Sequence, residues 1–216
     1  MMTNLFSVFD PCTGILSLNW LSMMMFLFIM PYKFWILPNK SSMSMMLILN
    51  NLHKEIIMLM PYKGMSLIML SLFLFILFNN LMGLLPYIFT SSSQLIFSNS
   101  LAVPMWLSMI MYGVYNKLNH MFSHLVPSGT PFILMPFMVL IETVSNIIRP
   151  GSLAVRLAAN MIAGHLLMSL LGNNTSNFMM FLVMFMYIGI MMFETAVALI
   201  QSYVFMTLTT LYSSEI

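Results

Sequence analysis

The sequence is poor in charged side chains. Asp, Glu, Lys and Arg make up 6% of its 216 residues, while 61% are hydrophobic and the mean hydropathy is +0.97. A soluble domain of this size carries about 25% charged residues, so the composition excludes an ordinary soluble domain and indicates a membrane protein. The net charge is only +2. With no basic cluster, nucleic-acid binding is not expected.

Cysteine is also scarce. Cys12 is the single cysteine, which excludes an internal disulfide framework and a cysteine-rich metal site. The sequence has no glycine-rich phosphate loop and no Ser-His-Asp arrangement, so we expect no enzyme activity in the chain by itself. His120 and His124 are four residues apart, but no third ligand is nearby. We therefore expect neither a metal nor a cofactor.

Long apolar runs are abundant instead. A helix needs about 20 such residues to cross the hydrocarbon core. A weaker run, 44–60, contains His53, Lys54 and Glu55 and predicts an amphipathic helix on the membrane surface. We predict an all-α, polytopic membrane protein with one membrane domain, 1–216, this surface helix and about five embedded helices: 15–30, 66–89, 95–115, 132–172 and 178–212.

The last two runs are too long for simple spans. At 1.5 Å per residue they would extend ~50–60 Å, against a hydrocarbon core of ~30 Å. An ordinary tilt of about 20° does not absorb this excess. We predict a strongly inclined or bent hairpin, closed at 173–177, that presents a long side to a partner.

Lysines and methionines indicate orientation and compartment. The connection between the first two spans holds Lys33, Lys40, Lys54 and Lys63, which places the amino terminus outside and the carboxyl terminus inside. Methionine occurs 29 times, which indicates either the codon bias of an A+T-rich organelle genome or a methionine-tolerant surface that faces lipid. The first residues have no basic stretch and no small-residue cleavage site, so we expect no cleaved signal peptide. We expect synthesis in a mitochondrion, with the matrix as the inside.

Arg156 is the most informative residue. Placing an arginine at membrane depth costs roughly 2.5–3.5 kcal/mol or more, so an intramembrane arginine is a candidate functional residue. Glu142, Arg149 and Arg156 are seven residues apart and share one helical stripe if the helix continues through Pro150. This stripe is flanked by small or weakly polar residues, which let another helix approach closely: Ser152, Ala159, Asn160 and Ala163. His165 faces the other way.

On the returning helix, Glu194 and Gln201 share a stripe, and counting from Thr175 places Glu194 level with Arg156. An internal salt bridge between Arg156 and Glu194 is therefore one alternative. His165 could equally be a satisfied core histidine. For Asn79 and Asn80 we expect hydrogen bonds in helix packing rather than ligand roles.

These residues lie in stretches that resemble subunit a of F-type ATP synthases (ATPase subunit 6), in its mitochondrial, insect-like form. LAVRLAAN, at 153–160, is highly specific for that family. The resemblance runs through most of the chain, and its matching stretches are LHKE (52–55), FNNLMGLLPYIFT (78–90), HLVPSGTP (124–131), IETVSNIIRPGSLAVRLAANMIAGHLL (141–167) and VALIQSYVFMTLTTLY (197–212).

The resemblance implies a proton-conducting stator subunit in the mitochondrial inner membrane. Its partners would be a rotating ring of c subunits, other stator subunits, protons and lipid. Arg156 would face the ring carboxylates, with Gln201 beside it. His165 and Glu194 would belong to the outer half-channel and Glu142 to the matrix exit. We add Asn160, which flanks Arg156, to the proton pathway.

Two other classes remain open. A respiratory subunit that carries haem or quinone needs paired ligands on facing spans, whereas only His165 lies deep in the predicted membrane region. A purely architectural membrane subunit would use Arg156 only as a salt-bridge partner.

Overall fold

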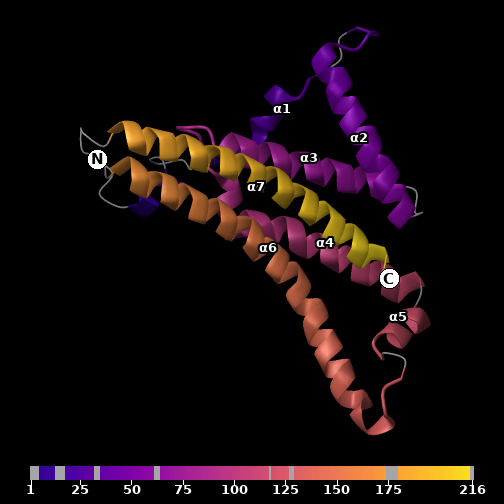
Figure 1. Ribbon diagram of the computed structural model, residues 1–216. Coiled ribbons are helices and arrows are strands. Elements are labelled where there is room, and N and C mark those ends of the chain that lie inside the picture. The colour runs from indigo at the N-terminus through magenta and orange to yellow at the C-terminus, as the bar shows by residue number, and fades with distance from the viewer. Residues whose placement is uncertain are drawn as a thin grey trace.

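The computed structural model describes residues 5–12, 18–31, 35–60, 64–116, 118–126, 129–173 and 180–214. All regular elements in these ranges are helical (Figure 1), so the predicted all-α class is confirmed. The α-helices are α1 (Phe26–Ile29), α2 (Lys40–Leu59), α3 (Met65–Gly83), α4 (Leu95–Asn116), α5 (Leu118–His124), α6 (Met135–Asn173) and α7 (Met180–Ser214); the 3-10 helices are η1 (Leu5–Phe9), η2 (Leu18–Met24), η3 (Ser91–Ser93) and η4 (Phe132–Leu134).

Four helical segments of the described chain are long and apolar enough to cross a membrane: Met65–Gly83, Leu95–Asn116, Phe132–Asn173 and Met180–Ser214. The predicted span 15–30 is described only from Leu18 onward, where 3-10 helix η2 is followed by the single turn α1. The piece Leu18–Ile29 is shorter than the ~20 residues of a crossing. A membrane role for this segment stays a prediction.

Helix α3 ends six residues before the predicted boundary at 89. Pro86 explains this, because the residue before a proline avoids the α conformation. The chain then turns back through η3 toward α4. A Cβ on Gly83 would lie 3.2 Å from the Thr90 side chain, so the glycine lets the loop pack closely on the end of α3.

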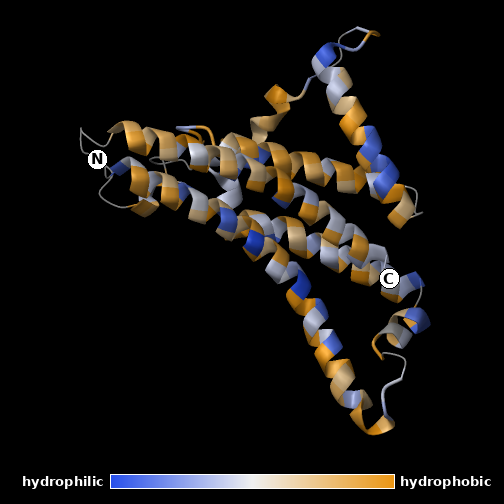
Figure 2. Ribbon diagram, viewed as in Figure 1, coloured by the Kyte–Doolittle hydropathy of each residue, from blue (hydrophilic) through white to orange (hydrophobic). Residues whose placement is uncertain are grey.

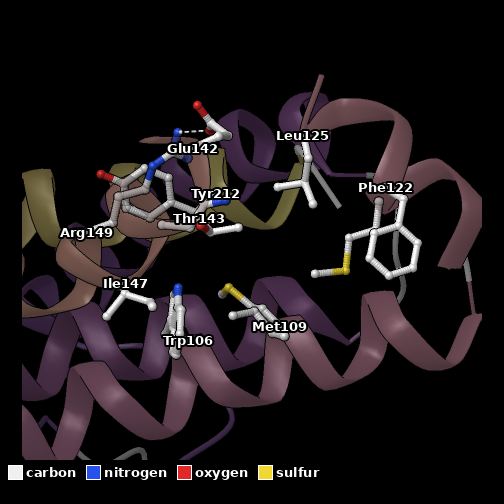
Figure 3. Close-up of a pocket in the computed structure, with 12 residues that line it drawn as sticks. Trp106, Met109, Phe122, Leu125, Glu142, Thr143, Ile147, Arg149 and Tyr212 are labelled. Atoms are coloured by element: carbon white, nitrogen blue, oxygen red, sulfur yellow. Dashed lines mark ion pairs between the residues drawn. The ribbon is translucent and has the colours of Figure 1, made fainter. Parts of the chain in front are cut away.

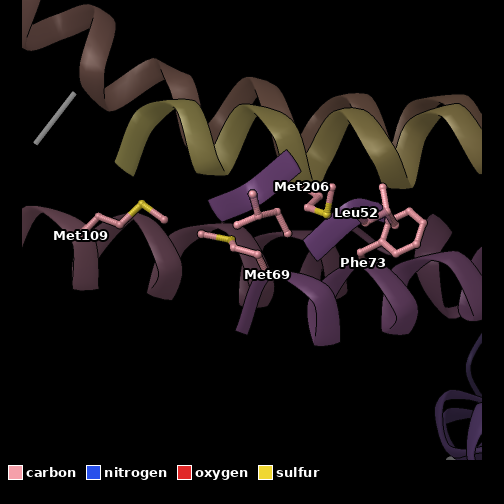
Figure 4. Close-up of a cluster of buried hydrophobic side chains, with 6 residues drawn as sticks. Leu52, Met69, Phe73, Met109 and Met206 are labelled. Atoms are coloured by element: carbon pink, nitrogen blue, oxygen red, sulfur yellow. The ribbon is translucent and has the colours of Figure 1, made fainter. Parts of the chain in front are cut away.

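Helix α3 forms much of the core together with α4, α6 and α7. Its buried residues Met69 and Phe73 pack with Leu52 and Ile56 of α2, Met109 of α4 and Met206 of α7 (Figure 4). A second cluster joins α3, α4, α6 and α7: Ile76, Ala102, Leu153, Ala154, Leu157 and Phe205. The first end of α2 stands away from the bundle, and its last turns return to α3 and α7 (Figure 1).

Helices α6 and α7 form the predicted long hairpin. They contain 39 and 35 residues, ~60 and ~50 Å at 1.5 Å per residue. Helix α6 runs beside α7 over its second half and bends away over its first half (Figure 1). Pro150 lies inside α6 and removes one backbone hydrogen bond, the usual cause of such a kink. Both helices are mostly apolar, with isolated polar residues along them (Figure 2).

Candidate functional site

Arg156 lies on the exposed face of α6. Leu153, Ala154, Leu157 and Ala158 are buried against the bundle, so the residues between these positions point outward. The helix continues through Pro150, as the predicted stripe required. No hydrogen bond or ion pair joins Arg156 to any residue that the structure describes. Its guanidinium is thus directed outward with its donors unused by the described chain.

The surface around Arg156 is made of small side chains. Ser152, Ala159 and Ala163 are exposed on the same side of α6. Small residues allow the backbone of another helix to come close. A neighbour could therefore reach the guanidinium without displacing large side chains.

Asn160 connects this face to α7. Its Nδ2 donates a hydrogen bond to Oε1 of Gln201 over 2.9 Å. Gln201 is buried, whereas Asn160 is exposed one turn after Arg156. This pair sets the register of the two helices where they pass the arginine.

Glu194 packs directly on Gly164. The residue is only 8% exposed, and a Cβ added at Gly164 would overlap its carboxylate. Oε1 of Glu194 is buried and has no hydrogen-bond partner among the described residues. A glycine at this point of α6 is what lets the carboxylate enter the helix interface.

These contacts correct the depth that we expected for Glu194. Equal counting from Thr175 placed it level with Arg156, but it lies against Gly164, eight residues or ~12 Å further along α6. Near Arg156, α7 instead supplies Phe205, which packs in one cluster with Leu153 and Leu157. The alternative of an Arg156–Glu194 salt bridge is therefore wrong. The hairpin is not symmetrical about Thr175, because side-chain packing sets its register.

His165 follows Gly164 in α6, so it lies close to the point where Glu194 of α7 packs on that helix. Its side chain points away from the Arg156 face. The Gly83 backbone at the end of α3 lies within hydrogen-bonding reach of its ring. The Phe9 ring meets the imidazole edge-on, with centroids 6.3 Å apart. Its Nε2 is buried without a described hydrogen-bond partner. Both interpretations of His165, as a core histidine and as a proton-carrying residue, therefore stay predictions.

Asn80 differs from the expectation that both asparagines of α3 form hydrogen bonds in helix packing. Asn79 donates to the Phe75 carbonyl of its own helix, over 3.0 Å. Asn80 is fully buried, yet neither its Oδ1 nor its Nδ2 has a partner in the described chain. It lies one turn before Gly83, whose backbone is close to His165. Buried polar atoms are normally hydrogen-bonded, and unpaired ones indicate bound water or function.

We call His165, Glu194 and Asn80 the buried polar cluster. Ser92 of η3 extends it, because its Oγ is also buried without a described partner and η3 packs against α3 and α6. Buried polar groups of this kind are normally hydrogen-bonded, so each of them is a candidate for binding water.

Glu142 and Arg149 form a second polar site near the first part of α6. Their side chains make an ion pair at 3.5 Å, which confirms that they share a stripe. The Arg149 guanidinium also lies over the Tyr212 ring of α7, 5.0 Å from its centroid. This pair occupies one wall of a half-open cavity of about 580 Å³ between α4, α5 and α6 (Figure 3). Apolar side chains, including Trp106, Met109 and Phe122, form most of the remainder.

The structure therefore divides the predicted site residues among three places. Arg156, Asn160 and Gln201 lie together along one part of the hairpin. His165 and Glu194 lie further along, and Glu142 lies beside the cavity. The fold adds Asn80, because its complete burial without a partner among the described residues is visible only there.

Some predictions fall outside the described part of the chain. These are Lys33, Lys63, residues 174–177 of the predicted turn and the His124 side chain. A joint metal site of His120 and His124 therefore stays untested. Within the described residues, no three His, Cys, Asp or Glu side chains are grouped to hold a metal ion.

Comparison with known proteins identifies the family of the chain. Residues 12–214 match the family model described as ATP synthase A chain. The chain is 56% identical to the ATP synthase subunit a of Anopheles quadrimaculatus and 56% identical to that of Drosophila melanogaster. It is 53% identical to the subunit a of Locusta migratoria. In each case all of both chains is covered. The chain therefore belongs to the ATP synthase A chain family.

Proposed function

We propose that this chain is the proton-conducting stator subunit of a mitochondrial ATP synthase. It would lie in the inner membrane with its amino terminus toward the intermembrane space. ATP chemistry would take place on partner subunits. The observation that carries this proposal is the position of Arg156, an outward-facing guanidinium in a long apolar hairpin that has no hydrogen bond or ion pair with any described residue.

Arg156 would act on a carboxylate of a partner that moves past α6. A positive charge within a few ångströms lowers the pKa of a carboxylate by about 1–3 units, so the partner releases its proton when it faces the arginine. A guanidinium stays charged in proteins and thus blocks direct proton passage. Small residues beside Arg156 leave room for a close-fitting ring of helices.

The buried polar cluster would form the outer proton inlet. His165 and Glu194 can both hold and release protons, and Asn80 can orient water between them. All three lie on the bundle side of α6, whereas Arg156 lies on the exposed side. A proton that enters here would be delivered to the partner carboxylate near the hairpin surface.

Glu142 would serve the matrix exit. It is partly exposed beside the cavity, and its ion pair with Arg149 holds the carboxylate in place. The cavity would give water access to the departing proton. Each proton that crosses the membrane potential supplies ~2.3 kcal/mol per 100 mV, the energy that the partner ring would convert into rotation.

The test uses the assembled ATP synthase with Arg156→Ala. We expect the complex to assemble, because the side chain makes no described contact, and we expect proton-driven ATP synthesis to be lost. Lys40→Ala, which removes a positive charge at the start of α2, is the control and should retain synthesis. Normal coupled synthesis by Arg156→Ala would refute the proposal.

A further inference from the structure

The amino-terminal segment, residues 5–12, lies beside His165 of the buried polar cluster. It contains η1, which packs against α6. Phe9, its last helical residue, is the point of contact with His165. The rings meet at an interplanar angle of 82°, so the edge of one faces the plane of the other. This geometry is a favoured aromatic contact and fixes how the imidazole is oriented.

Gln94 holds this segment in place through a hydrogen bond to its backbone. Its Nε2 donates a hydrogen bond of 2.7 Å to the Phe9 carbonyl, and its own backbone directly follows η3. Phe9 is thus held by its main chain while its ring rests on His165. The two anchors come from residues 85 and 156 positions away in the sequence.

Asp10, the residue after Phe9, accepts two further hydrogen bonds. Oδ1 of Asp10 accepts a hydrogen bond from the Cys12 backbone N–H over 3.1 Å. The Asp10 carbonyl accepts one from Nδ2 of Asn19 over 3.4 Å. Trp20 then packs edge-on against Phe89, with centroids 5.9 Å apart. Residues 5–12 are therefore held by hydrogen bonds from Gln94 and Asn19 in addition to their packing on α6.

We propose that residues 5–12 form the outer cover of the proton inlet, with Phe9 and Gln94 as positioning residues for His165. The inference rests on the proposed function, because it assigns His165 to the inlet. Phe9 excludes bulk water from the imidazole and keeps its buried nitrogen turned toward the cluster. The hydrogen bond from Gln94 keeps the Phe9 backbone where its ring can contact His165. Protons then reach His165 from the side of residues 5–12 and not by direct contact of the imidazole with bulk water.

Two measurements on the intact ATP synthase in mitochondrial membranes test this assignment. The first is the rate at which diethyl pyrocarbonate, added to both sides of the membrane, modifies His165, with His53 of α2 as the internal reference. The second is the rate of proton flow through the membrane sector. A merely structural role of Phe9 in folding would not change the His165 rate selectively.

Phe9→Ala should raise the modification rate of His165 several-fold relative to His53 and should slow proton flow. Phe6→Ala is the matched control, because Phe6 is an aromatic residue of the same η1 that is 68% exposed. It should leave both rates unchanged. Phe9→Tyr keeps the ring and should restore both. Gln94→Glu keeps the size of the side chain but removes the donor, and it should resemble Phe9→Ala.

Equal His165 modification in the Phe9→Ala and Phe6→Ala complexes would overturn the cover. Faster modification with unaltered proton flow would overturn the positioning role. Either result is distinct from failure of the proposed function, which Arg156→Ala tests without any change in residues 5–12.

Discussion

Gly164→Ala separates the function of Glu194 from the stability of the hairpin. The added Cβ would overlap the Glu194 carboxylate, so this group must move while both helices stay in place. The carboxylate is the far end of a flexible side chain and can turn aside. Function should therefore be affected more strongly than folding.

The expected stability change is small because two effects oppose each other. Alanine favours a helix over glycine by about 1 kcal/mol. Extra volume in a packed interface costs typically 1–3 kcal/mol. The net loss is therefore expected to be ~0–2 kcal/mol, and the complex should assemble. A misplacement of ~1 Å in a reacting group can cost about 100-fold in rate, so we expect proton flow to fall roughly 10- to 100-fold.

The assay is proton flow through membranes that contain equal amounts of assembled complex. Gly172→Ala is the matched control, because Gly172 lies in the same helix and an added Cβ there would meet nothing within 4 Å. It makes the same change in helix propensity without touching Glu194. If the two variants conduct protons equally, Glu194 is not on the path.

Three further substitutions test the remaining contacts. Asn160→Ala removes the donor to buried Gln201 and should lower the stability of the complex by about 1–3 kcal/mol, measured by thermal unfolding; an unchanged midpoint would contradict this. Glu142→Gln should leave assembly unchanged, because a partly exposed ion pair contributes only about 0–1 kcal/mol, but it should slow proton release into the matrix; unaltered proton flow would exclude Glu142 from the exit. Arg156→Lys should fail to restore coupled synthesis, because a desolvated ammonium can lose its proton; synthesis at the original rate would show that any cation suffices.

Hydropathy predicted the main helices closely. The run 95–115 became α4, Leu95–Asn116, and the run 132–172 became η4 and α6. Such runs are recognisable because every backbone group in lipid must be hydrogen-bonded, which a long apolar helix achieves by itself. The seven-residue spacing also predicted that Glu142 and Arg149 share a face, since this depends only on helical geometry.

The relation between the helices could not be predicted in the same way. Counting residues from a turn assumes that residues at equal distances from the turn lie opposite each other in the two helices. The register is instead determined by the contacts of Gly164 with Glu194 and of Asn160 with Gln201. The complete burial of Asn80, and the lack of partners for its side chain among the described residues, depend on the folded chain. The contact of Phe9 with His165 likewise spans 156 positions.

On the bundle side of α6, a packed apolar cluster separates Arg149 from His165, while Arg156 and Asn160 lie between them on the exposed face. Arg149 and His165 are sixteen residues apart, which is ~24 Å along a helix. Between them, Leu153 and Leu157 are buried with Phe205 in a cluster that α3 and α4 complete. An apolar cluster of this kind offers no groups that hold or pass on a proton. Under the proposed function, this packed cluster would keep a proton in the buried polar cluster from passing along the bundle side of α6 to Glu142. The proton would then leave on a partner at the Arg156 face.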